Sequence, residues 1–214
     1  MKTQQQQLHV ATPLRQSPAL SKAAGTSVYL KLDSSQPTGS FKIRGIGHLC
    51  KTWAERGCER FVCCSGGNAG MAAAYSAREL GVPATIVVPG VTPSPTVDRL
   101  RDEGAKVIVH GKSLDESIAY GQQLVANNPG WIFISPFDDP LICPSCVLPS
   151  DDEKVLVEPA CGAALAAVYS GVVRRLQAEG KLVPRLGPVV VVVCGGNNIS
   201  LEQLRRLKKQ LGVV

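Results

Sequence analysis

Short runs of apolar, mostly β-branched residues alternate with amphipathic segments between residues 60 and 135, and this alternation constrains the fold more than any other feature. A run that is apolar at every position is typical of a strand buried on both faces, and helices between such strands form the crossovers of a parallel sheet. Right-handed crossovers follow from the chirality of the chain. The predicted strands are 60–64, 84–89, 106–110 and 131–135, and the predicted helices are 71–80, 95–104 and 113–128. The sequence therefore predicts an α/β fold with four parallel strands and helices on both faces.

The segments on either side of this unit are less regular. A strand at 26–33 and a helix at 42–57 are predicted before it. After it, residues 143–155 have no periodicity and contain proline, serine and a short acidic run, which indicates a linker. The sequence then predicts one long alanine-rich helix, a buried strand and a last helix, at 158–180, 188–194 and 200–212. Three such elements cannot form an independent core of much size, so they must pack on other parts of the chain.

The charge of the chain does not indicate a nucleic-acid or membrane partner. Its formal net charge is +6, but the lysines and arginines are dispersed along predicted helices, and aromatic residues make up only 5%. A stacking surface for single-stranded nucleic acid is therefore not expected. The first ten residues lack the apolar core of a signal peptide, and the longest apolar run, at 188–194, is too short to span a bilayer. We expect a cytoplasmic protein without a membrane or nucleic-acid partner.

Eight cysteines occur at irregular spacings. Such spacing is more typical of free thiols in a reducing compartment than of a disulfide framework. The cysteines of "CPSC", residues 143–146, have no second pair and no nearby histidines, and they do not lie in the strand-to-helix context of a redox motif. The sequence predicts no metal site.

Lys42 lies in the stretch "PTGSFKIRG" and is the first candidate for covalent chemistry. A lysine that forms a Schiff base needs a glycine-lined pocket, an amine that loses its proton readily and a flat neighbour for a planar ligand. Phe41 would supply the flat face, and Gly39, Gly45 and Gly47 would let backbone and ligand come close. From these residues alone, a surface lysine at the start of a helix is the more common explanation.

Two glycine turns follow predicted buried strands, "SGGNAG" at 65–70 and "CGGNN" at 194–198. Ligands of open α/β sheets bind at the carboxyl ends of the strands, and a turn that opens a helix offers backbone N–H groups to a phosphate or a carboxylate. A tight turn without a ligand explains each of them equally well. A dinucleotide-binding domain is less well supported, because no acidic residue for a ribose follows at the expected place.

Taken together, these segments resemble the serine/threonine dehydratase family of pyridoxal-phosphate enzymes, which have fold type II. The resemblance is strongest to its L-serine dehydratase and serine dehydratase-like group. It rests on "PTGSFKIRG", "CCSGGNAGMAAAYSARELGVPATIVVP", "VEPACGAALAAVYS" and "VVVVVCGGNNISLEQLRRLK". It covers nearly the whole chain outside residues 143–150, and it implies pyridoxal 5′-phosphate as the cofactor and a small amino acid as the substrate.

The resemblance implies roles for residues on both sides of the first glycine turn. Lys42 would form the internal aldimine and, once freed by substrate, move the α-proton. Phe41 would pack on one face of the cofactor ring. Ser65, Gly67 and Asn68 would bind the substrate carboxylate, and Asn68 would also reach the phenolic oxygen of the cofactor.

The resemblance also places Cys194 opposite the pyridine nitrogen of the cofactor. A neutral thiol does not enforce a protonated ring, which favours β-elimination over transamination. Position 66 is glycine, where racemases of this fold carry a serine, and this favours a dehydratase. The implied reaction converts L-serine or L-threonine into pyruvate or 2-oxobutyrate and ammonia.

This chain departs from the family at one place. Family members have a segment about half as long as this chain between the motifs "PFDDPLI" and "DDEK", and here the eight residues 143–150 replace it. The segment includes a glycine run whose amides bind the cofactor phosphate, and an unmatched dianion is costly. We therefore expect the strand at 188–194 to lack partner strands, the C-terminal third to fold poorly, and the dehydratase activity to be nearly absent.

The expected architecture is an intact small domain and a truncated large domain. The large domain would contribute residues 1–42 and, as a C-terminal remnant, 158–214. The small α/β domain would span 43–136, followed by a junction at 137–157.

Two interpretations stay open. The first is an L-serine/L-threonine ammonia-lyase. The second is a catalytically inactive isoform or remnant that lacks the phosphate-binding loop, produced by a skipped exon or an error in the gene model. Either would be compatible with a homodimer or with association with a full-length subunit.

Overall fold

The computed structural model describes residues 7–136, 158, 161, 168–169, 171–196, 200 and 202. The chain divides into two compact units. Unit 1 comprises residues 1–10 and 41–144, and unit 2 comprises residues 11–40 and 145–214. Each unit is therefore assembled from segments that are separated in the sequence.

Unit 1 is built on a four-stranded parallel sheet, as the alternation of apolar runs predicts. Its strands pair in the order β5-β4-β3-β6. Their bounds are β3 (Arg60–Cys63), β4 (Ala84–Val88), β5 (Lys106–Val109) and β6 (Trp131–Ile134). All four strands are confirmed within one residue of their predicted ends.

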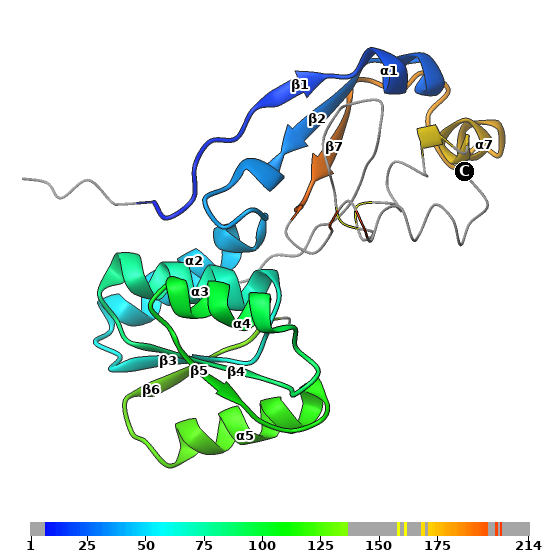
Figure 1. Cartoon of the computed structure of the whole chain (residues 1–214). Coiled ribbons are helices and arrows are strands. Elements are labelled where there is room, and N and C mark those ends of the chain that lie inside the picture. The colour runs from blue at the N-terminus through cyan, green and yellow to red at the C-terminus, as the bar shows by residue number, and fades with distance from the viewer. Residues whose placement is uncertain are drawn as a thin grey trace, which may run out of the picture. The chain divides into compact units, whose positions relative to one another are not determined.

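Helices cover both faces of this sheet (Figure 1). The helices are α2 (Lys42–Glu55), α3 (Asn68–Leu80), α4 (Ser94–Asp102) and α5 (Leu114–Ala126). Side chains alternate across β3: Phe61 and Cys63 belong to the cluster with α2, α3 and α4, whereas Val62 and Cys64 belong to the cluster with α5. Successive side chains of a strand point to opposite faces of the sheet. A strand that is covered by helices on both faces is therefore apolar at every position.

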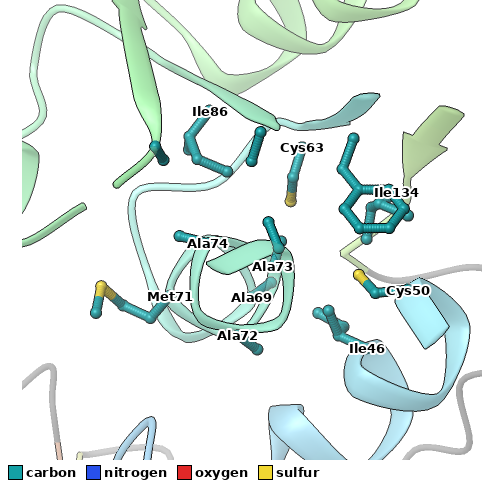
Figure 2. Close-up of a cluster of buried hydrophobic side chains, with 14 of the residues drawn as sticks. Ile46, Cys50, Cys63, Ala69, Met71, Ala72, Ala73, Ala74, Ile86 and Ile134 are labelled. Atoms are coloured by element: carbon teal, nitrogen blue, oxygen red, sulfur yellow. The ribbon is translucent and has the colours of Figure 1, made fainter. Parts of the chain in front are cut away.

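Alanines of α3 let it pack closely between the sheet and α2 (Figure 2). Ala69, Ala72 and Ala73 point into the cluster and are at most 4% exposed. Across the cluster, Ile86 comes from β4 and Ile46 from α2. Because alanine side chains are short, the backbone of α3 approaches both neighbours, and this fixes the start of α3 relative to the carboxyl ends of the strands.

The start of α5 shows how local sequence sets an element boundary. The side chain of Ser113 accepts a hydrogen bond from the N–H of Glu116, and the Glu116 carboxylate accepts one from the N–H of Lys112. A serine followed three residues later by a glutamate is a known helix-start pattern. Helix α3, in contrast, begins at Asn68, three residues earlier than predicted, because the last part of "SGGNAG" is already helical.

Unit 2 contains a three-stranded sheet in the order β1-β2-β7. Strand β1 (Leu14–Gln16) pairs antiparallel with β2 (Val28–Leu32), and β2 pairs in parallel with β7 (Val189–Val193). The other described elements of this unit are α1 (Pro18–Ala24), the 3-10 turn η1 (Asp33–Ser35) and α7 (Val172–Ala178).

Three sequence predictions for unit 2 need correction. The valine run was expected to lack partner strands, but β7 pairs with β2 over five residues, from Val28–Val189 to Leu32–Val193.

The alanine-rich helix was expected to run unbroken from 158 to 180, but Gly171 has φ 69° and stands before the first residue of α7. A left-handed residue cannot continue a right-handed helix, and glycine adopts that conformation without steric cost. The sequence predicted no element before residue 26, but β1 and α1 lie there.

Other predictions concern residues that the structure does not describe. The junction at 137–157, including "CPSC", lies outside the described residues, as does nearly all of the helix predicted at 200–212. Within the described part of the chain, no helix is both long enough and apolar enough to cross a membrane.

Candidate active site

Lys42 is the first residue of α2 and is held at the carboxyl end of a strand of unit 1. Its Nζ donates a hydrogen bond to the main-chain oxygen of Pro136 at 2.7 Å. Pro136 follows the end of β6 by two residues. The ring of Phe41 lies beside the amine, with 5.6 Å between Nζ and the ring centroid. The amine and an aromatic face are thus brought together at the edge of the sheet.

The glycine turn Ser65–Gly67 lies at the same edge. It follows β3, which pairs in parallel with β6 so that Cys63 is opposite Ile134. The turn begins two residues after Cys63, just as Pro136 comes two residues after Ile134. Because the carboxyl ends of neighbouring parallel strands meet, the Lys42 amine and the turn face a common region, as expected for a ligand site in an α/β sheet.

The glycine turn is held by a hydrogen bond to the Ser65 side chain and by contact with the start of α3. Ser65 Oγ accepts a hydrogen bond from the N–H of Gly67 at 3.1 Å. A Cβ at Gly70 would overlap the main-chain oxygen of Ser65, so the helix begins directly against the turn. Asn68 is the first residue of this 13-residue helix. The positive end of the helix dipole therefore acts on whatever binds at the turn.

Thr92 is a neighbour of the turn that sequence reasoning missed. A Cβ at Gly66 would lie 2.9 Å from Thr92 Cγ2 and 3.4 Å from its Oγ1. Thr92 lies between β4 and α4, beyond the carboxyl end of β4. Strand β4 pairs with β3, so the residues that follow the two strands lie at the same edge of the sheet. This position would have identified Thr92 as a neighbour of the turn.

The thiols beneath the site remain protonated. Burial raises the pKa of Cys63 far above its usual range, although the positive charge of Lys42 partly opposes the shift. Burial also raises the pKa of Cys64 to about 12, and the main-chain N–H of Gly121 opposes this shift. Neither thiol carries a negative charge at neutral pH, so they do not reduce the positive potential that Lys42 and the start of α3 create.

Cys194 belongs to unit 2, whereas the other five predicted site residues belong to unit 1. It directly follows β7 and is 3% exposed. Its Sγ lies 2.8 Å from Cys161 Sγ. The next residue, Gly195, accepts a hydrogen bond from the N–H of Glu158 and forms a β-bridge with Ser40.

The sequence matches proteins of known activity over most of its length. The family model described as "Pyridoxal-phosphate dependent enzyme" matches residues 6–147. A bovine protein named "L-serine dehydratase/L-threonine deaminase" is 43% identical, and the alignment covers 96% of this chain and 97% of the bovine protein. The human protein of the same name is 44% identical, with 96% of each chain covered.

The alignments also show a difference in length. The bovine alignment extends over 316 positions, whereas this chain has 214 residues, so at least 102 positions (316 less 214) have no residue of this chain.

The fold is similar to that of a solved structure. The structure of a fungal L-serine ammonia-lyase from Rhizomucor miehei matches with a TM-score of 0.81 at 24% identity, covering 96% of this chain and 99% of that one. This likeness agrees with the α/β architecture of fold type II that the sequence predicts. The chain therefore belongs to the family of pyridoxal-phosphate dependent enzymes, whose cofactor is pyridoxal phosphate.

Proposed function

We propose that this chain is an ammonia-lyase that converts L-serine, and L-threonine, into the corresponding 2-oxo acid and ammonia. The observation that carries the proposal is the position of the Lys42 amine at the sheet edge that also holds the Ser65–Gly67 turn. The names of the bovine and human relatives support the choice of substrates.

The described residues fit the reactive end of pyridoxal phosphate. An aldehyde needs an amine partner, and Lys42 presents one that is half-buried and held by the Pro136 oxygen. A planar ring needs a flat apolar neighbour, and Phe41 lies beside that amine. When bound, the cofactor ring withdraws electron density from the substrate and so makes its α-proton removable.

In this proposal, Lys42 Nζ holds the cofactor and then takes the α-proton of the substrate. Ser65, Gly67 and Asn68 bind the substrate carboxylate through the turn and the positive end of α3. The substrate loses its α-proton and β-hydroxyl as water, and hydrolysis of the remaining enamine gives the 2-oxo acid and ammonia. The role of Phe41 against the ring and that of Cys194 opposite the ring nitrogen remain predictions from the family resemblance.

Replacement of Lys42 tests the proposal. Lys42→Ala should lower the rate of ammonia release from L-serine by about 10²–10⁴-fold, because the variant lacks the base. Lys51→Ala is the matched control, since Lys51 lies on the same helix in a surface ion pair with Glu55, and it should keep the parent rate. A parent that releases ammonia, with an equal rate in Lys42→Ala, would contradict the assignment of Lys42.

A second candidate is a member of the family without ammonia-lyase activity. The observation in its favour is that at least 102 positions of the bovine alignment have no counterpart here. Titration of the purified chain with pyridoxal phosphate separates the candidates. Saturable binding followed by ammonia release from L-serine supports the enzyme. Absence of both, together with co-purification with a full-length relative, supports the inactive form.

A further inference from the structure

Two cysteines of unit 2 lie with their sulfur atoms almost in bonding contact. The Sγ atoms of Cys161 and Cys194 are 2.8 Å apart, although the residues are 33 positions apart in the sequence. A disulfide bond is about 2.05 Å long, so the two atoms are separated by less than about 1 Å more than the bond requires. Neither residue is in a disulfide bond in the structure.

Main-chain contacts hold the two cysteines close together. The Cys161 thiol donates to the main-chain oxygen of Gly195 at 3.4 Å, and that oxygen also accepts from the N–H of Glu158. The N–H of Cys161 in turn donates to the oxygen of Glu158 at 2.7 Å. The segment around Cys161 is therefore tied to the residue that follows Cys194, and the approach of the sulfurs does not depend on the two side chains alone.

We propose that Cys161 and Cys194 are an oxidation site that forms a reversible disulfide. Each Sγ–H bond breaks and one Sγ–Sγ bond forms. Hydrogen peroxide is the oxidant: it accepts the two electrons and the two protons and leaves as two molecules of water. A dithiol such as dithiothreitol reverses the reaction by thiol–disulfide exchange. Disulfides of proteins in reducing compartments are typically of this transient kind.

The pair has few competitors among the buried thiols of unit 1. Cys63 and Cys64 are adjacent in the chain, but their side chains belong to different clusters on opposite faces of the sheet, so the two sulfurs do not face each other. Cys161 and Cys194 are 0% and 3% exposed. We therefore expect a small oxidant such as hydrogen peroxide to reach the pair more readily than a bulky alkylating reagent does.

One consequence rests on the proposed function. If Cys194 faces the cofactor ring, its oxidation removes the neutral thiol from that place. Ammonia release should then fall after peroxide treatment and recover with dithiothreitol.

Peptide mapping tests the disulfide independently of activity. The purified chain is treated with a slight excess of hydrogen peroxide, blocked with iodoacetamide and digested with trypsin. The expected product is a linked pair of peptides, 155–174 with 186–205, two hydrogen masses lighter than their sum. A link within "CPSC" stays inside peptide 113–154 and is distinguished by mass. Dithiothreitol should separate the linked pair into its two peptides.

Two variants keep the test decisive. Cys161→Ser should abolish the linked pair, while Cys58→Ser, at a half-buried thiol of unit 1, should leave its yield unchanged. Recovery of peptides 155–174 and 186–205 only as separate, carbamidomethylated or over-oxidised species from the peroxide-treated parent would overturn the proposal.

Discussion

At the scale of single residues, the Lys42 amine donates a hydrogen bond to a main-chain oxygen. The acceptor belongs to Pro136, whose position depends on the path of the chain after β6 and not on a particular side chain. No sequence pattern reveals such an acceptor, whereas the glycines around Lys42 are visible in the sequence.

Gly70 tests how tightly the turn and α3 fit together. Gly70→Ala should lower the free energy of unfolding by about 1–3 kcal/mol, because the new Cβ would overlap the main-chain oxygen of Ser65. Gly90→Ala is a matched control, since its Cβ would meet only ordinary contact at 3.5 Å, and it should change stability by less than about 0.5 kcal/mol. Urea unfolding followed by the fluorescence of Trp53 and Trp131, both in unit 1, measures each value. Equal stabilities for the two variants would show that the turn is looser than described.

The raised pKa of Cys64 predicts how stability depends on pH. The folded chain keeps this thiol protonated up to about pH 12, whereas in the unfolded chain it ionises near its ordinary pKa of 9.0. The unfolded state therefore binds fewer protons above pH 9, and the stability that the buried thiol contributes is lost as pH rises from 9 toward 12. Urea unfolding should show a loss of about 1 kcal/mol more between pH 8 and pH 10 for the parent than for Cys64→Ala. Parallel pH curves for the two proteins would contradict the buried, protonated thiol.

At the scale of elements, the periodicity of the sequence was sufficient to predict the strands of unit 1, but it was not sufficient to predict all the elements of unit 2. The four strands of unit 1 are apolar on both faces, so each is visible as a run. Strand β1 is three residues long and exposed at every position, so it leaves no such pattern. A short signal for α1 was present in Ser17 and Pro18, which act as its N-cap and first helical residue. The interruption at Gly171 was hidden because glycine inside an alanine-rich run also occurs in unbroken helices.

The pairing of β7 with β2 makes a prediction about the valine run. Val191 is 5% exposed and pairs with Leu30, whereas Val190 is 54% exposed. Val191→Asp should therefore destabilise unit 2 by about 3 kcal/mol or more, because it buries a charge without a partner.

Val190→Asp is the matched control for this substitution and should have little effect. Amide hydrogen exchange at Val28–Leu32 reports on the pairing, and these amides should lose protection in Val191→Asp alone. Equal protection in both variants would show that β7 does not pair with β2 in this register.

At the scale of the whole molecule, the chain alternates between two units, with boundaries at residues 10, 40 and 144. The family resemblance implies that residues 1–42 belong to the large domain, and nothing in the polar N-terminal stretch indicates which of its residues are buried. In the structure Leu8 is 6% exposed and belongs to the cluster that contains Ile43 and Ile46. Long-range assembly of this kind is set by three-dimensional packing, and a single sequence carries little trace of it.

Leu8 tests the assignment of the first ten residues to unit 1. Leu8→Ala should lower the stability of unit 1 by about 2–4 kcal/mol, because the site is nearly fully buried. Val10→Ala should be nearly neutral, since Val10 is 46% exposed. Unfolding followed by Trp53 and Trp131 fluorescence compares the two variants. A neutral Leu8→Ala would show that this segment does not pack on the core of unit 1.

We propose above all that Lys42 is the lysine that carries pyridoxal phosphate. The most direct measurement is reduction of the cofactor-treated chain with borohydride, followed by tryptic peptide mass analysis. We expect one phosphopyridoxyl group on the peptide 32–44, in which trypsin no longer cleaves after Lys42, and no such product from Lys42→Ala. A modification confined to other lysines, or a cofactor-treated chain that gains no mass at all, would contradict it.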